Sequence, residues 1–200
     1  MAISDFAGLS VAETESWIDA LASHGVDAVQ IRAKTLPDSE LEALTLRVVR
    51  IAAGRLRVLI NGRADLAVAS GADGVHLPST GLPAAALRRH FPRLLLGLST
   101  HHLEEVHAAA GVVDYVSFSP IYETPSKAAF GPAKGLAMLS RAAEIGVPII
   151  ALGGLDAERL PNVARAGAYG VAAIRALQDR RSLVEMAARA AQAFGLAGPH

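Results

Sequence analysis

The sequence predicts a small (β/α)8 TIM barrel of the α/β class, formed by a single compact domain over residues 1–200. Eight apolar, strand-like segments alternate with helical patterns, and most helical patterns end at a glycine. The strand-like segments do not alternate apolar with polar residues, which is typical of a parallel sheet covered by helices. Eight such units in 200 residues fit the smallest barrels. A doubly wound open sheet stays the alternative, because strand order cannot be read from one sequence.

The expected elements divide the chain regularly. Strands are expected at 1–4, 26–32, 57–61, 72–77, 94–99, 113–118, 147–152 and 168–174. A helix follows each strand; Ser10 or Thr14 can cap the first, which runs through Leu21, and Pro37 opens the second. Glycine accepts the left-handed backbone that follows a helix, and it precedes six of the strands, at Gly25, Gly54, Gly71, Gly111, Gly146 and Gly167.

The composition excludes several classes of protein. With 52% hydrophobic and 19% charged residues, the chain can bury a core. Its 19 basic and 19 acidic side chains cancel, so neither nucleic acid nor an anionic membrane is expected as a partner. The absence of cysteine excludes disulfides and thiol nucleophiles. No signal peptide and no apolar stretch of about 18 residues stands out, which predicts a cytoplasmic protein. The sequence leaves open whether the protein forms a homo-oligomer.

Polar residues gather at the expected carboxyl ends of the strands, where barrels bind their ligands. They are Gln30, Arg32 and Lys34 at the end of the second strand, Asn61 at the end of the third, His76 in the fourth, Ser99 and His101 at the end of the fifth, and Thr124, Ser126 and Lys127 after the sixth. Each alone has a structural explanation, such as a paired arginine, a turn asparagine or a buried histidine. Their shared position at the strand ends is what predicts a site.

The chemistry of these residues points to a small phosphorylated ligand. Arg32 and Lys34 supply positive charge for phosphate or carboxylate. Gly153 and Gly154 follow the seventh strand, and Ile174-Arg175 follow the eighth; barrels bind phosphate there through backbone N–H groups. We find no pair of carboxylates aimed at one point, as a magnesium-diphosphate site needs. The sequence therefore predicts a phosphate site without a metal.

Several motifs in order resemble the thiamine phosphate synthase/TenI family. They are Gln30-Ile-Arg-Ala-Lys34, Leu59-Ile-Asn-Gly-Arg63, Gly71-Ala-Asp-Gly-Val-His76, Gly97-Leu-Ser-Thr-His101, Asp114-Tyr-Val, Pro120-Ile-Tyr and Ala151-Leu-Gly-Gly154. The resemblance covers nearly the whole chain and implies a (β/α)8 barrel. One branch of this family joins a pyrimidine diphosphate to a thiazole phosphate with Mg²⁺. The TenI-like branch includes thiazole tautomerases, which aromatise a carboxythiazole phosphate by moving a proton.

The resemblance also implies roles for individual residues. By that likeness, positions 30–34, Asn61, Ser99 and Lys127 contact the pyrimidine diphosphate of a synthase. Thr124-Pro-Ser126 contact thiazole phosphate, and Gly154 with Ile174-Arg175 bind its phosphate group.

Two departures from the synthase pattern favour the TenI-like branch. Synthases carry a metal-binding aspartate after the asparagine of the third strand, where this chain has Gly62. Their second aspartate falls where this chain reads Pro78-Ser-Thr-Gly81. We therefore expect a thiazole tautomerase without a cofactor, with Mg²⁺ only if the chain is a synthase after all. A non-catalytic binder of thiazole phosphate is the third reading.

One further departure leaves the proton-transfer group open. The branch has a histidine in the loop after the sixth strand, and this chain has Pro120 there. Proton transfer needs a titratable group within reach of the substrate. His101 is the first candidate and His76 the second, with Lys34 and Lys127 as further options.

Overall fold

The structure, a computed structural model, describes residues 1–124 and 131–195. Its strands form one parallel sheet in the order β1-β2-β3-β4-β5-β6-β7-β8. Their bounds are β1 Ala2–Ser4, β2 Ala28–Ile31, β3 Arg57–Asn61, β4 Gly74–Leu77, β5 Leu95–Thr100, β6 Tyr115–Phe118, β7 Ile149–Leu152 and β8 Gly170–Ala172. This sequential order confirms the TIM barrel, and the doubly wound alternative is wrong.

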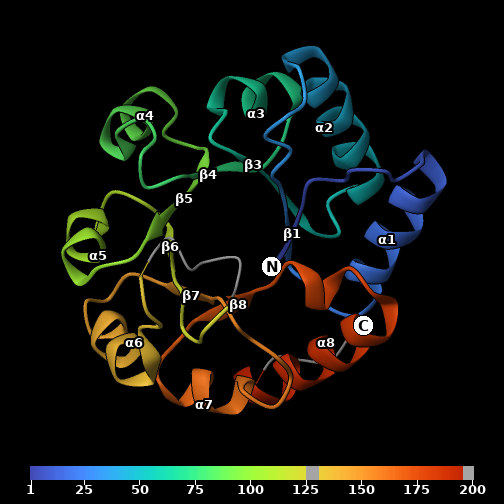
Figure 1. Cartoon of the computed structure of the whole chain (residues 1–200). Helices are drawn as coiled ribbons and strands as arrows, with labels where there is room; N and C mark the ends of the chain where they lie inside the picture. The colour runs from blue at the N-terminus through green and yellow to red at the C-terminus, as the bar shows by residue number, and fades with distance from the viewer. Residues whose placement is uncertain (125–130, 196–200) are drawn as a thin grey trace.

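The last strand returns to the first and closes the ring. Just after β8, Ala173 forms a parallel bridge with Ala2 of β1. The Ile3 amide donates to the Ala173 carbonyl oxygen at 3.0 Å, and the Ala173 amide donates to Met1 O at 3.2 Å. Figure 1 looks along the axis of this ring, and the helices surround it in chain order.

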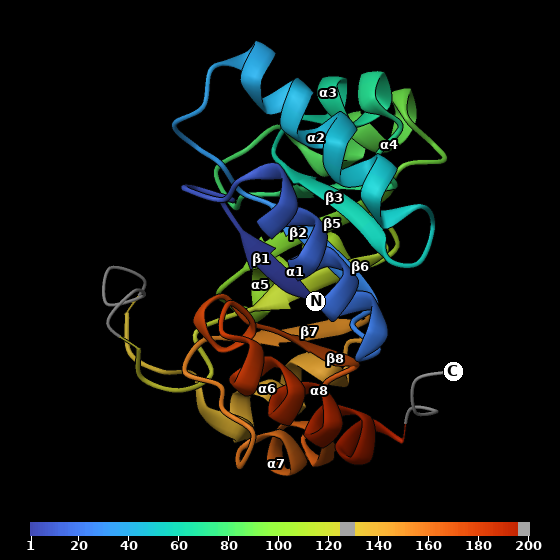
Figure 2. The ribbon, with the colours of Figure 1, turned by 90° about the vertical axis from the view of Figure 1, so that its right-hand side faces the viewer.

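The helices follow the strands as expected. They are α1 Val11–Ser23, α2 Asp38–Ala52, α3 Ala64–Ser70, α4 Ala84–His90, α5 Leu103–Ala109, α6 Gly135–Ala143, α7 Leu160–Arg165 and α8 Arg180–Phe194, with a short 3-10 helix, η2 Arg175–Leu177, before the last. Figure 2 shows the helices covering the outer face of the strands from the side. No helix within the described ranges is long and apolar enough to cross a membrane.

Ser10, rather than Thr14, caps α1. The Glu13 amide donates to Ser10 Oγ at 3.2 Å, and the Ser10 amide donates to Glu13 Oε2 at 2.8 Å. This reciprocal capping box satisfies two amides that the first turn of the helix leaves without partners. Thr14 lies inside the helix and donates its hydroxyl to Ser10 O at 2.9 Å.

Several strands begin two residues later than predicted, because the helix termini use the residues after the glycines. The Val26 amide donates to Leu21 O, the Ala72 amide to Ala67 O, and the Ala168 amide to Val163 O. This bond reaches back five residues, as in a Schellman motif. Gly25, Gly71 and Gly167 hold the positive φ that the motif requires, at 74°, 70° and 89°. The apolar residues at these positions therefore belong to the turns.

Alternation along the strands separates the outer core from the barrel interior. Val29 and Ile31 of β2 belong to the cluster that packs against the helices. Gln30, between them, faces the other way, and so does its register partner Leu59 on β3. A methyl group added at Gly74 would lie 2.8 Å from Leu59 Cδ2 and 2.6 Å from Leu95 Cβ, so these side chains crowd the interior. The interior is filled, and a ligand can reach it only from the ends of the strands.

Candidate functional site

The predicted residues of the second strand divide between the interior and the surface. The Gln30 side chain is only 1% exposed, and its Nε2 has no hydrogen-bond partner in the described part of the chain. Arg32 and Lys34 follow it and are exposed, and neither forms an ion pair within residues 1–124 and 131–195. A buried amide without a partner costs about 1–3 kcal/mol. Gln30 is therefore a donor suited to a bound ligand.

The buried His76 contacts the half-buried Ser99 in a hydrogen-bonded group. The His76 Nε2 atom lies 2.9 Å from Ser99 Oγ and 3.3 Å from Ser117 Oγ. Its Nδ1 lies 3.0 Å from the Tyr115 hydroxyl. The four side chains come from β4, β5 and β6, and His76 is 4% exposed. Both ring nitrogens contact hydroxyl groups, so the geometry favours a role for His76 in holding Ser99.

Gly97 makes room for this group. A methyl group there would lie 2.2 Å from Tyr115 Cζ and 2.6 Å from His76 Nδ1. Real carbon atoms do not approach so closely, and neither ring can move far in a filled interior. The histidine and tyrosine therefore occupy the space that any other residue at position 97 would need.

His101 has a backbone carbonyl as a partner, whereas His76 contacts hydroxyl groups. His101 is 7% exposed, and its Nδ1 lies 2.8 Å from the carbonyl oxygen of Ser119. A carbonyl oxygen only accepts, so Nδ1 carries the hydrogen and Nε2 is the basic nitrogen of the neutral ring. A general base is oriented by a third group, and a backbone carbonyl can serve as that group. Strand alternation also puts His101 on the same side as Ser99.

The Gly153-Gly154 turn packs tightly against the loop that follows β6. Both residues have positive φ, 103° and 64°. A methyl group on Gly153 would lie 2.9 Å from Pro120 Cα, and one on Gly154 would lie 2.8 Å from Glu123 O and from Tyr122 O. Crowding alone thus explains why these residues are glycine. Whether they also bind phosphate stays a prediction.

The remaining predicted residues lie around the same end of the barrel. Asn61 is half-buried at the end of β3, in register with His76. Ile174 is half-buried and Arg175 exposed, where β8 leads into η2. Thr124 is half-buried in the loop after β6. Ser126 and Lys127 lie outside the described residues.

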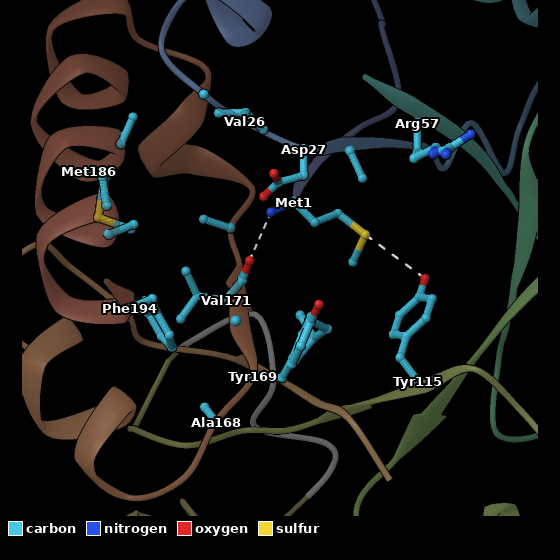
Figure 3. A pocket seen from close by; sticks show the side chains of 18 of the residues that line it. Met1, Val26, Asp27, Arg57, Tyr115, Ala168, Tyr169, Val171, Met186 and Phe194 are labelled. Atoms are coloured by element: carbon cyan, nitrogen blue, oxygen red, sulfur yellow. Dashed lines mark hydrogen bonds between the residues drawn. The ribbon is translucent and has the colours of Figure 1, made fainter. Parts of the chain in front are cut away.

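A cavity of about 810 Å³ lies at the opposite end of the barrel. Figure 3 shows Met186 and Phe194 of α8 on one side of it and Arg57 at the start of β3 on the other. Its lining is mostly apolar and comes from the amino ends of the strands. Barrels do their chemistry at the carboxyl ends, so the polar group around Ser99 marks the candidate site better than this cavity does.

Comparison with known proteins decides the family. A family model described as thiamine monophosphate synthase matches residues 2–177. The chain belongs to this family. The family is an enzyme family of thiamine biosynthesis, as the motifs had predicted. The match runs from β1 to the end of η2, so it includes every strand of the barrel.

Several relatives in this family carry the name thiamine-phosphate synthase. The thiamine-phosphate synthase of Anaeromyxobacter dehalogenans is 42% identical over 173 residues, covering 85% of this chain and 78% of that protein. That of Methanoculleus marisnigri is 42% identical over 161 residues, covering 78% and 76%. The solved structure of a thiamine phosphate pyrophosphorylase from Pyrococcus furiosus superposes with a TM-score of 0.84 at 25% identity, over 97% of this chain and 95% of that one.

The carboxylates near this end of the barrel do not fit the Mg²⁺ that the synthase branch uses. Arg63 forms ion pairs with both Asp38 and Asp65, and its hydrogen bonds hold the pKa of the Asp65 carboxyl below the usual range. Glu123 accepts from the Ala133 amide at 3.0 Å. Within the described ranges, no three histidine, aspartate or glutamate side chains converge as metal ligands would.

The sequence-based prediction missed Tyr115 and Ser117. Both lie on β6 and are nearly buried, and both contact His76. A signal was present in the alternation Tyr115, Ser117, Ser119, which puts three hydroxyl groups on one side of an otherwise apolar strand. In a barrel, that side is the interior.

Proposed function

We propose that the protein is a TenI-like thiazole tautomerase. It binds a carboxythiazole phosphate at the carboxyl ends of the strands and moves a proton within it without a metal. The observation that carries the proposal is the lack of carboxylates available for a metal. Gly62 stands at one metal-ligand position of the synthases, and the nearby Asp38 and Asp65 both form ion pairs with Arg63. Without Mg²⁺, loss of diphosphate lacks its main electrostatic support.

Cationic and polar groups around the strand ends can hold such a substrate. Arg32 and Lys34 offer charge for its carboxylate, and neither has an ion-pair partner among the described residues. Arg175 and the turn at Gly153-Gly154 offer charge and backbone N–H groups for its phosphate. Gln30 supplies a buried donor that lacks a partner in the described chain.

His101 then moves the proton. Its Nδ1–H is held by Ser119 O at 2.8 Å, which leaves Nε2 as the basic nitrogen. Nε2 takes a proton from the nonaromatic ring and returns it to another carbon of the same molecule. The substrate rearranges its double bonds and becomes aromatic, with no change in composition or net charge. General base catalysis of this kind contributes about 10²–10⁴-fold in rate.

A thiamine phosphate synthase is the second candidate. It would couple hydroxymethylpyrimidine diphosphate to thiazole phosphate. The names of the relatives at 42% identity support this candidate more directly than the tautomerase. The carboxylate arrangement supports the tautomerase, and we give it more weight because it concerns the residues of this chain.

One experiment separates the candidates. Purified protein is offered the nonaromatic carboxythiazole phosphate in EDTA and, separately, both synthase substrates with Mg²⁺. Aromatic product in EDTA without thiamine phosphate in the second reaction supports the proposal. Thiamine phosphate formed only with Mg²⁺ supports the synthase instead. Tight binding of thiazole phosphate with neither product would mean that the protein is a non-catalytic binder.

A further inference from the structure

We propose that Tyr115 is a positioning residue that sets the direction of the hydrogen bonds through His76, so that Ser99 presents its hydroxyl hydrogen to the ligand. The chain of contacts is short: Tyr115 Oη to His76 Nδ1 at 3.0 Å, then His76 Nε2 to Ser99 Oγ at 2.9 Å. It runs from the interior toward the carboxyl end of β5.

The direction follows from the partners of the Tyr115 hydroxyl. Its single hydrogen can point to His76 Nδ1 at 3.0 Å or to Met1 Sδ at 4.0 Å, the contact drawn in Figure 3. A thioether is a weak acceptor, whereas a neutral imidazole nitrogen is a strong one. The tyrosine therefore donates to Nδ1, and the histidine hydrogen resides on Nε2.

The second step fixes Ser99. An Nε2–H group can only donate, so Ser99 Oγ, the nearer of its two hydroxyl partners, accepts from it. A hydroxyl that accepts this bond keeps its own hydrogen for another partner. That hydrogen suits a phosphate or carboxylate oxygen, which only accepts. The opposite tautomer would make Ser99 donate inward and turn its lone pairs toward the anion.

The surroundings keep the arrangement in place. Tyr115 is 8% exposed, and burial raises the pKa of its hydroxyl far above the usual value, so it stays protonated and able to donate. Because residue 97 has no side chain, the rings of His76 and Tyr115 can lie against each other, with 5.5 Å between their centroids. The cavity at the opposite end of the barrel is lined in part by Tyr115, whereas neither His76 nor Ser99 lines it.

The test begins with ¹⁵N NMR of the ring nitrogens in the free protein, at a pH where the His76 ring is neutral, with His76→Gln to assign the signal. We expect the Nε2–H tautomer in the wild type and a mixture of tautomers in Tyr115→Phe. Tyr169→Phe, at an exposed tyrosine, is the control. An Nδ1–H tautomer in the wild type, or an unchanged Nε2–H tautomer in Tyr115→Phe, overturns the proposal. If Tyr115→Phe does not fold, the wild-type spectrum alone decides.

The second readout rests on the proposed function, because it needs a ligand at Ser99. The probe is 4-methyl-5-(2-phosphoethyl)thiazole, with affinity measured by calorimetry. We expect affinity about 10-fold weaker in both Tyr115→Phe and Ser99→Ala, as for the loss of one charge-assisted hydrogen bond. Weak binding in Ser99→Ala with full affinity in Tyr115→Phe overturns the positioning role. If the wild type does not bind the probe at all, the proposed function fails, while the NMR result still tests the tautomer.

Discussion

Ser99 Oγ lies 2.9 Å from His76 Nε2, so a predicted ligand contact and a predicted proton carrier form one partly buried pair. The pairing gives the two histidines different tasks. His76 is enclosed by hydroxyl groups, whereas His101 is held by the Ser119 carbonyl and keeps a basic Nε2. The candidate site thus combines a hydrogen-bonding wall with one group able to move a proton.

Replacing Gln30 separates binding from stability. Gln30→Met keeps the size of the side chain and removes an amide whose Nε2 has no partner in the described chain. We expect thermal stability to stay equal or rise, since an unpaired buried donor costs about 1–3 kcal/mol. We also expect affinity for thiazole phosphate to fall about 10-fold. A melting temperature several degrees lower, with unchanged affinity, would show that Gln30 is purely structural.

A methyl group at Gly97 disrupts the His76–Tyr115 contact. Gly97→Ala puts Cβ 2.2 Å from Tyr115 Cζ, so overpacking of about 1–3 kcal/mol or more is expected. Gly170→Ala is the matched control, because its Cβ meets only the end of the Ile150 side chain at 3.2 Å. Denaturant unfolding should show a clearly lower free energy of unfolding for Gly97→Ala and little change for Gly170→Ala. Equal stability of the two variants would contradict the packing described here.

The close approach at Gly154 predicts a binding defect beyond backbone strain. Gly154→Ala costs about 1–2 kcal/mol for its φ of 64° and also clashes with Tyr122 O and Glu123 O. Gly146→Ala carries the same kind of strain at φ 90° with nothing within 4 Å. Both variants should lose stability, and only Gly154→Ala should bind thiazole phosphate more weakly. Full affinity in Gly154→Ala would remove this turn from the proposed site.

The Arg63 ion pairs predict a small loss of stability in acid. Arg63 lowers the pKa of the Asp65 carboxyl, so its contribution is present above the ordinary aspartate pKa of about 4 and is lost as pH falls through the lowered value. The Asp65 side chain is 64% exposed, so the effect stays below about 1 kcal/mol. Asp65→Asn should therefore be slightly less stable than wild type at pH about 7 and equal to it at pH about 2, by urea unfolding. Glu15→Gln, at an exposed carboxylate, serves as the control. If Asp65→Asn differs from the wild type in unfolding free energy by the same amount at both pH values, the ion pair described here is contradicted.

The fold could be predicted because its signals are local. Gly25, Gly71 and Gly167 mark helix ends through their own φ angles, and apolar strands mark a covered sheet. The strand starts were placed too early, because Val26 and Ala72 look like strand residues yet bond back to the preceding helix. Such bonds depend on backbone geometry and leave no trace in residue type.

The candidate site could be predicted as a set of positions, but its contacts could not. The sequence placed Gln30 among the polar residues at the strand ends, and the two missing aspartates are visible at Gly62 and at positions 78–81. The pairing of His76 with Tyr115 joins residues 39 positions apart, and it depends on how β4, β5 and β6 align. Register between strands is a tertiary property, so sequence alone did not reveal which hydroxyl groups surround which histidine.

The most direct test of the central claim is the rate of aromatisation of the nonaromatic carboxythiazole phosphate in excess EDTA, followed by ³¹P NMR. We expect turnover that added Mg²⁺ does not increase. We also expect a loss of rate of at least about 100-fold in His101→Gln and no loss in His107→Gln, at an exposed histidine of α5. No turnover of this substrate, with Mg²⁺-dependent formation of thiamine phosphate by the same preparation, would contradict it.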